Sequence, residues 1–319
     1  MRLVDRVMGE PELREAPPVL VDVGAAGGVN PAWRTIARHS IGVGFEPDAR
    51  EAAPLDGARR LFGQWIFCPG LAVPAPPPGG RATFHLTRSP QCSSTLKPRA
   101  EALGEWAFAG FFDVEEIRSL PAVTLEAALA ARGLSRVDWL KCDTQGTDLK
   151  LYLSLPKAWR ARMLAVEFEP GLIDAYEGED KLADVLSAME AEPFWLADLR
   201  VGRTPRGRPA LLARHLGAGA ARWFRRLGPE APAWANACFL RDPHAGPEFL
   251  DRRGHLLGWV FATLVGQHGH ALAVADAGTS RFGGGLFAEM TASSVRRLRW
   301  AMARGVPAML WRRLTRPSA

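Results

Sequence analysis

The sequence contains few cysteines and places none of them in a pattern typical of metal sites or disulfide frameworks. Its four cysteines include no C-x-x-C pair and no series of short, regular spacings. The seven histidines are equally scattered, without the spacing of metal ligands. We therefore expect neither a metal site nor disulfides, and a reducing compartment is the default. The cysteines are Cys68, Cys92, Cys142 and Cys238.

The sequence also lacks a hydrophobic run long enough to cross a membrane. Residues 256–265 form an apolar run of ten residues that ends shortly before Gln267 and His268, whereas a spanning helix needs about 20 apolar residues. Residues 1–20 mix Arg, Asp and Glu and contain no apolar region of the signal-peptide kind. With 47% hydrophobic and 23% charged residues, the composition is that of an ordinary globular protein. We therefore expect a cytoplasmic location.

Lysine is absent from the last part of the chain, which is rich in arginine instead. From Arg200 onward there are 19 arginines and six acidic residues, a net charge of +13, whereas the preceding residues carry −7. Residues 291–313 predict a pair of basic amphipathic helices after a flexible glycine-rich link at 278–285. Such helices can lie on an anionic membrane surface, but we favour packing against the main domain or at a homo-oligomer interface. The arginines follow no recognised nucleic-acid-binding module, so we expect no nucleic-acid partner.

A strand that runs into a glycine-rich turn is the most informative feature of the first half. Residues 19–23 form the mostly apolar run that is typical of a buried parallel strand. Three glycines follow closely, and Asn30 and Pro31 then mark the start of a helix, with a helical pattern over 32–37. A strand, a glycine turn and a helix in this order predict a nucleotide-type cofactor site with helix amides facing the ligand.

Glu46 ends the second predicted strand, residues 41–45, where an acidic residue would hold the hydroxyl groups of a ribose. The dinucleotide fingerprint G-x-G-x-x-G would need glycine where Ala26 stands. The pattern D-x-G-x-A-x-G at 22–28 instead resembles the first motif of class I S-adenosylmethionine-dependent methyltransferases. A glycine turn in a non-binding α/β domain is the alternative. The candidate cofactor-binding residues are Asp22, Gly24, Ala25, Ala26, Gly27, Gly28 and Glu46.

Further predicted strands alternate with predicted helices. The strands are 61–68, 81–88, 137–142, 163–168 and 194–199, and the helices are 48–60, 124–132 with Thr124 as N-cap, and 181–189. This alternation predicts an α/β protein with a doubly wound, mostly parallel sheet and helices on both faces. Ligands bind beyond the carboxyl ends of such strands. We therefore expect Gly24, Glu46, Asp143, Glu167 and Glu169 to gather at one edge of the sheet.

One longer motif makes the resemblance specific. The stretch V-D-W-L-K-C-D-T-Q-G-T-D-L at 137–149 is similar to the signature of FkbM-type methyltransferases. The glycine turn, the loop at 89–96 and the segments 123–126 and 237–241 also follow in the order of that family. The resemblance covers about residues 17–243, roughly three-quarters of the chain.

The resemblance implies a Rossmann-like class I methyltransferase domain over 1–243, with an Arg-rich helical extension over 244–319. It also implies O-methylation of a hydroxyl group on a sugar, glycan or natural product, with S-adenosyl-L-methionine as cofactor. Two positions depart from the family pattern. Gln145 replaces the commoner Glu, so this position is not a carboxylate base, and Ala26-Gly27 replaces Asn-Ile, which removes one polar contact.

An alcohol becomes a good nucleophile only when a base or a metal takes its proton. Asp143, at the tip of its strand, is the first candidate for the catalytic base and Glu167 is the second. A divalent cation between them stays open but is not predicted. The acidic segment 167–181 is either a substrate loop or the charged start of a helix. Two other functions stay open: a nicotinamide-dependent oxidoreductase, and a non-catalytic scaffold that binds a membrane or partner through its Arg-rich end.

Overall fold

The computed structural model describes residues 2–25, 28–51, 56–243 and 251–315. The chain divides into two compact units, one over Pro17–Gly246 and the other formed by Met1–Ala16 with Pro247–Ala319. The start of the chain thus belongs with the C-terminal helices, whereas sequence analysis grouped it with the methyltransferase-like part.

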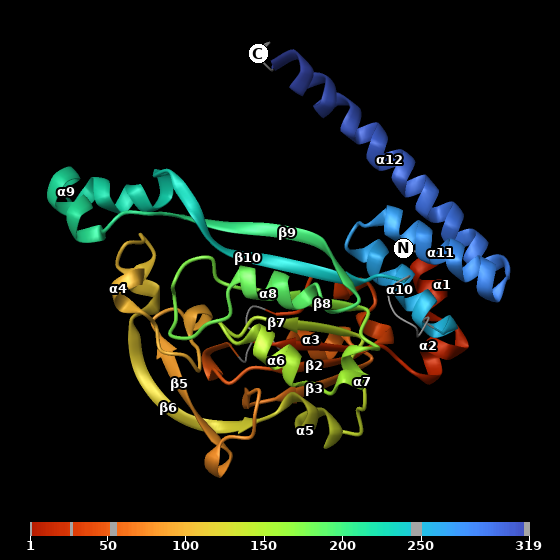
Figure 1. The fold of residues 1–319 in the computed structure, drawn as a ribbon, viewed down its shortest axis with the longest axis horizontal. Coiled ribbons are helices and arrows are strands. Elements are labelled where there is room, and N and C mark those ends of the chain that lie inside the picture. The colour runs from red at the N-terminus through yellow and green to blue at the C-terminus, as the bar shows by residue number, and fades with distance from the viewer. Residues whose placement is uncertain (1, 26–27, 52–55, 244–250, 316–319) are drawn as a thin grey trace. The chain divides into compact units, whose positions relative to one another are not determined.

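The unit over Pro17–Gly246 is built on a mixed seven-stranded sheet (Figure 1). The strand order is β3-β2-β1-β7-β8-β10-β9, and the four contacts that join β3, β2, β1, β7 and β8 are all parallel. Only β10 runs antiparallel to its neighbours β8 and β9. The predicted α/β class with a mostly parallel sheet is therefore confirmed. The strands are β1 (Val19–Val23), β2 (Ile41–Phe45), β3 (Gln64–Cys68), β7 (Trp139–Cys142), β8 (Ala165–Phe168), β9 (Phe194–Pro205) and β10 (Glu230–Arg241).

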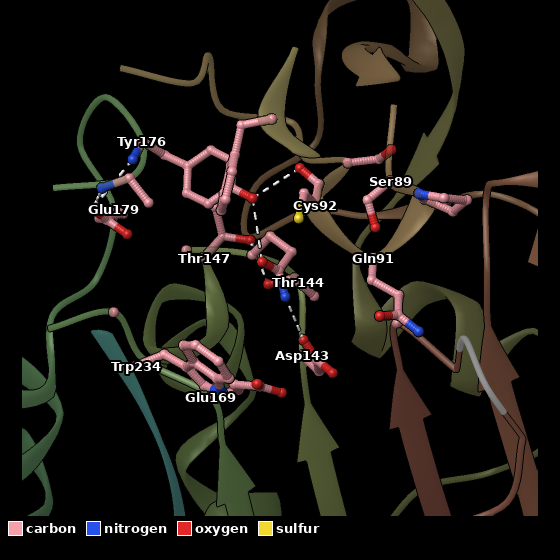
Figure 2. A pocket seen from close by; sticks show the side chains of 18 of the residues that line it. Ser89, Gln91, Cys92, Asp143, Thr144, Thr147, Glu169, Tyr176, Glu179 and Trp234 are labelled. Atoms are coloured by element: carbon pink, nitrogen blue, oxygen red, sulfur yellow. Dashed lines mark hydrogen bonds between the residues drawn. The ribbon is translucent and has the colours of Figure 1, made fainter. Parts of the chain in front are cut away.

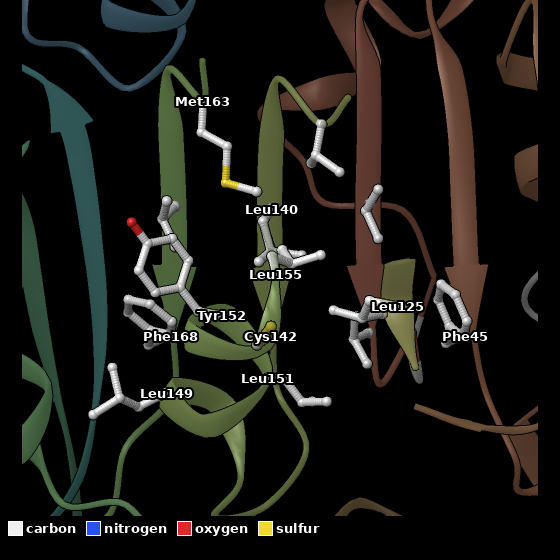
Figure 3. Close-up of a cluster of buried hydrophobic side chains, with 14 of the residues drawn as sticks. Phe45, Leu125, Leu140, Cys142, Leu149, Leu151, Tyr152, Leu155, Met163 and Phe168 are labelled. Carbon is white, nitrogen blue, oxygen red and sulfur yellow. The ribbon is translucent and has the colours of Figure 1, made fainter. Parts of the chain in front are cut away.

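One face of this sheet carries the main hydrophobic core (Figure 3). Every second residue of β1 points to this face, as the two-residue period of a strand requires, and Val21 lies level with Val43 and Leu140 in the register. Three helices cover it: α5 (Leu125–Ala130), α6 (Asp148–Ser154) and α8 (Leu182–Met189). As predicted, Thr124 is the N-cap of α5, because its side chain accepts a hydrogen bond from the Ala127 amide at 3.3 Å.

The opposite face is covered differently from what the sequence predicts. Two short 3₁₀ turns, Trp33–Thr35 and Ala37–His39, replace the helix expected after the glycine turn. The rings of Trp33 and Trp139 meet edge to face with their centroids 5.9 Å apart. Trp33 is buried there, and β2 begins soon afterwards at Ile41. Tertiary packing outweighs helix propensity here.

The same unit contains a second, smaller sheet, which the sequence did not predict. Its strands follow the order β4-β6-β5, and β6 pairs in parallel with β4 and antiparallel with β5. Strand β6 is mostly exposed and mixes charged with apolar residues, so its hydrophobic period is weak. The predicted strand at 81–88 is confirmed as β5. The bounds are β4 (Leu71–Ala72), β5 (Arg81–Thr87) and β6 (Val114–Val123).

An arm interrupts the antiparallel hairpin of the large sheet. Between β9 and β10 the chain forms α9 (Pro209–Leu227), which lies at the far end of the hairpin in Figure 1. Gly217 interrupts this helix with φ 79° and ψ 155°, and no residue of α9 is fully buried. The sequence predicted only the first half of β9. The remaining short helices of this unit are α3 (Asp56–Leu61), α4 (Ala100–Leu103), α7 (Lys157–Arg160) and the 3₁₀ turns Ala49–Glu51, Pro78–Gly80, Pro90–Cys92 and Ala109–Phe112.

The other unit is helical: α1 (Arg2–Met8), α2 (Pro11–Glu15), α10 (Arg252–Leu264), α11 (His268–Phe282) and α12 (Gly285–Thr315). The link predicted at 278–285 is reduced to Gly283 and Gly284, because Gly278 lies inside α11 and leaves room for the ring of Phe287. The predicted helix pair at 291–313 is one helix, α12. Trp259 donates to Ser294 Oγ at 2.9 Å and ties α10 to α12. Across the described residues, no helix is both long and apolar enough to cross a membrane.

Candidate active site

A cavity of about 700 Å³ opens at the carboxyl ends of β1, β2 and β7, within the unit Pro17–Gly246. The residues that line it fall into two chemically different groups, which we call the first and the second half of the cavity. The first half is lined by Gly24, Glu46, Gly70, Leu71, Ala72 and Phe84, and the second by Phe108, Phe111, Phe112, Ile173, Tyr176 and Trp234. Asp143 and Glu169 also line the cavity and follow the adjacent strands β7 and β8.

Gly24 forms the turn at the end of β1 in the first half. Its φ is 81°, a value that residues other than glycine rarely adopt. A Cβ at this position would also overlap the carbonyl oxygen of Asp143. The ends of β1 and β7 can approach closely only because this side chain is missing. The amides of Gly24 and Ala25 both donate to the carbonyl of Phe45 at 3.0 Å. These two amides therefore stabilise the turn itself. The prediction of a helix after the turn, with its amides facing a ligand, is wrong because two 3₁₀ turns stand in its place.

The other predicted cofactor residues divide into three groups. Glu46 lines the cavity together with Gly24. Ala25 and Gly28 do not belong to the wall as the structure describes it, and neither does Asp22. Ala26 and Gly27 lie outside the described residues.

Glu46 follows β2 and is nearly buried at the wall of the first half. Its Oε1 accepts a hydrogen bond from the Asp48 amide at 2.8 Å. Burial raises the pKa of Glu46 to about 7, and the negative charges of Asp48, Glu51 and Asp143 add to that increase. A carboxylate has room for about four acceptor contacts, so Glu46 can accept further hydrogen bonds from a ligand.

Asp143 and Glu169 form a carboxyl pair at the cavity wall, where Figure 2 shows both side chains. Burial, the charge of Asp143 and a side-chain hydrogen bond to it raise the pKa of Glu169 to about 9. Two carboxylates so close together cannot both ionise easily. With a pKa of about 9, Glu169 therefore stays protonated at neutral pH.

Asp143 is held in place from two directions. The Gln145 side-chain amide donates to Asp143 Oδ1 at 2.8 Å, and Lys141 Nζ lies 3.9 Å from Oδ2. Burial alone would lower the pKa of Lys141, but the charges of Asp22 and Asp143 raise it above its usual value. The ammonium group therefore stays protonated. Lys141 thus places a positive charge beside Asp143. This residue was not among the site residues predicted from the sequence.

Lys141 is the centre of a polar row across three strands. In the register it lies between Asp22 on β1 and Glu167 on β8. Its Nζ is 2.8 Å from Asp22 Oδ1, and Glu167 Oε1 accepts hydrogen bonds from Trp139 Nε1 at 2.8 Å and Asn30 Nδ2 at 3.0 Å. Asp22 and Glu167 are therefore engaged within the sheet.

Glu167 consequently does not reach the cavity wall as described, although sequence analysis proposed it as the second base. Glu169 occupies that place instead. Glu167 pairs within the sheet, whereas Glu169 lies just beyond the end of β8, so its side chain extends past the sheet edge. The sequence put both acids at the edge but gave no reason to prefer Glu169.

The loop after Asp143 has an unusual backbone that its neighbours hold in place. Gln145 has φ 57°, an uncommon value for a residue with a side chain. Its carbonyl accepts from Ser94 Oγ at 2.8 Å, and its Oε1 lies 3.2 Å from the Tyr176 hydroxyl. Strain of this kind costs about 1–3 kcal/mol and persists where the surroundings enforce it. It places the Gln145 amide against Asp143.

The second half of the cavity is rich in aromatic side chains and includes two arginines, Arg203 and Arg225. Arg203 lies on β9 and Arg225 on α9, so the arm forms part of the wall. In the acidic segment 167–181, Glu179 Oε1 accepts from the amides of Ala175 at 2.6 Å and Tyr176 at 3.1 Å. Glu179 therefore shapes the loop that carries Tyr176. Flat, apolar walls with a few charged groups suit a ring-shaped ligand that also carries polar substituents.

Among the described residues, no group of three or more His, Cys, Asp or Glu side chains is arranged to hold a metal ion. Comparison with models of known protein families and with curated proteins found no match for this chain.

Proposed function

We propose that this protein is an S-adenosylmethionine-dependent O-methyltransferase of the FkbM type, which acts on a hydroxyl of a sugar, glycan or natural-product acceptor. The observation that carries the proposal is the two-part cavity with the Asp143–Glu169 pair at its wall. Methyl transfer requires a donor and an acceptor to be held in line. A single cavity with two different halves can provide both places.

The first half fits the proposed cofactor. The Glu46 carboxyl group can accept hydrogen bonds from the two ribose hydroxyls, and the apolar side chains of Leu71 and Phe84 can contact the flat base. Gly24 lets the backbone approach the ligand closely. The Asp143 carboxylate is suited to the positive charge of a sulfonium. When bound, S-adenosylmethionine supplies an activated methyl group.

In this proposal Asp143 accepts the proton of the acceptor hydroxyl. Gln145 and Lys141 fix the direction of its carboxylate, while protonated Glu169 keeps the second negative charge away. A positioned base typically contributes about 10² to 10⁴ in rate. The aromatic half would hold the acceptor against Asp143, and Arg203 and Arg225 would contact its polar substituents.

The sheet order supports this proposal over a nicotinamide-dependent oxidoreductase. The dinucleotide-binding fold has six strands in the order 3-2-1-4-5-6. Here an antiparallel strand, β10, stands between the fifth strand and the last. The sheet therefore departs from the dinucleotide-binding order at its last two strands. The position of Ala26 in the turn also departs from the dinucleotide fingerprint.

Isothermal titration calorimetry with S-adenosylmethionine and with NAD tests the cofactor. We expect binding of S-adenosylmethionine only, and tight NAD binding without it would overturn the proposal. The variant Asp143→Asn should lose about 10² to 10⁴ in turnover and keep its affinity for the cofactor. Glu167→Gln is the matched control, because that carboxyl group lies outside the cavity wall. A larger loss of turnover in this variant than in Asp143→Asn would show that Asp143 is not the base.

A further inference from the structure

Helix α9 exposes large apolar side chains that nothing in its own unit covers. Trp223 is 58% exposed and Leu227 is 77% exposed, and because they are four residues apart they lie on one face of the helix. Leu211 and Leu216 are also exposed in the first half of α9. Exposed apolar groups that gather on one short element indicate an interaction surface.

The inner side of α9 is already used. Phe224 and Leu212 are only partly exposed and pack beside Gly207, which precedes α9, and Phe224 also contacts Gly228, which follows α9. These contacts hold α9 on the hairpin and fix which side faces outward. The face with Trp223 and Leu227 is therefore presented by a supported helix.

The charged side chains of the helix that carries this surface are all positive. Helix α9 contains four arginines and no acidic residue. In the part of the chain that the structure describes, none of these four guanidinium groups forms an ion pair; Arg225 lies over the Phe111 ring and Arg226 over the Trp223 ring. Arg222 and Arg226 are four residues apart, directly beside Trp223. The arginines are Arg214, Arg222, Arg225 and Arg226.

We propose that α9 docks this protein on the surface of an anionic phospholipid bilayer. Trp and Leu side chains on one face, with arginines beside them and no acid, are the pattern of a helix that lies in the membrane interface. Two copies of α9 would bring only like charges together, which disfavours self-association through this face. A nucleic acid would satisfy the arginines but leave Trp223 and Leu227 against a charged backbone.

Docking through α9 also has a consequence for the cavity. Arg225 belongs to α9 and lines the aromatic half, so a bilayer that contacts α9 lies close to that half. If methyl transfer occurs as proposed, the acceptor hydroxyl is then carried by a molecule anchored in the membrane. This consequence rests on the proposed function, whereas docking itself requires neither cofactor nor catalysis.

Vesicle co-sedimentation of the full chain, without cofactor, tests the docking. We expect binding to vesicles of phosphatidylcholine with phosphatidylglycerol, little binding to phosphatidylcholine alone, and weaker binding as salt increases. Each arginine near an anionic surface contributes about a fivefold gain in partitioning, so Arg222→Gln with Arg226→Gln should lower it by about 25-fold. Trp223→Ser with Leu227→Ser should lower it by about tenfold or more.

The matched control is Trp300→Ser with Met302→Ser, which removes two exposed apolar side chains from α12. This control should bind as the unchanged protein does. Loss of binding in the α12 control with normal binding in both α9 variants would overturn the proposal, as would equal binding to both kinds of vesicle. Sedimentation velocity without vesicles provides a further check. If the unchanged protein forms an oligomer and only the α9 variants are monomeric, a second copy of the chain is the partner of the α9 face, and the proposal is overturned. Circular dichroism confirms that each variant is folded.

Discussion

Replacing Glu169 with glutamine should make the free energy of unfolding less dependent on pH. The folded protein holds the Glu169 proton up to a pKa of about 9, whereas the ordinary value is 4.5. Between these two values the folded state binds one proton more than the unfolded state. The contribution of Glu169 to stability is therefore complete below about pH 4.5 and is lost as the pH rises through 9.

The size of the effect follows from the shift. One proton corresponds to about 1.4 kcal/mol per pH unit, so the unchanged protein should lose up to about 4 kcal/mol between about pH 5 and about pH 8 through this group alone. The effective dielectric constant of a protein site is higher than that of a dry interior, so we expect about half of that value. Glutamine carries no charge and can still donate to Asp143. The variant should therefore equal the unchanged protein near pH 5 and exceed it by about 2 kcal/mol near pH 8.

Urea denaturation at several pH values measures this difference. The matched control is the same substitution at Glu177, an exposed carboxylate paired with Lys97 at 3.2 Å, which should leave the pH dependence nearly unchanged. Parallel pH curves for Glu169→Gln and the unchanged protein would refute the reasoning, because they would show that Glu169 does not hold an extra proton. A second readout is turnover, which should fall as Glu169 ionises above about pH 9 and should persist there in the glutamine variant.

Two further predictions concern the first half of the cavity. Because the pKa of Glu46 is raised to about 7, the affinity for S-adenosylmethionine, measured by calorimetry, should increase from pH 6 to pH 8 as the carboxylate forms. Glu46→Gln should bind the cofactor about 10- to 100-fold more weakly, without that pH dependence. An unchanged affinity in this variant would show that Glu46 does not bind the ribose. Gly24→Ala should lower the free energy of unfolding by about 3 kcal/mol or more through strain and overlap with Asp143. The control Gly57→Ala, at a position with open space around it, should be neutral or slightly stabilising. Equal effects of the two variants in a denaturation assay would contradict the close approach of β1 and β7.

The sequence could predict the centre of the sheet because its strands are short, continuous apolar runs. β1 and β2 have the predicted bounds, and β7 and β8 lie within the predicted ranges. Each strand is buried on both faces, and that environment leaves a direct record in composition. The exposed strand β6 leaves no such record, and the turns after Gly28 depend on where Trp33 packs.

The amino-acid sequence by itself determined which acids end the strands, since the carboxyl ends of parallel strands share one edge and Glu46 and Asp143 stand at two of them. Only the tertiary structure decided which of those acids reach the cavity. Register places Glu167 beside Lys141 within the sheet, while Glu169 extends beyond the last paired residue. The aromatic wall and α9 likewise come from segments distant in sequence, because their placement depends on where the chain returns and not on any local pattern.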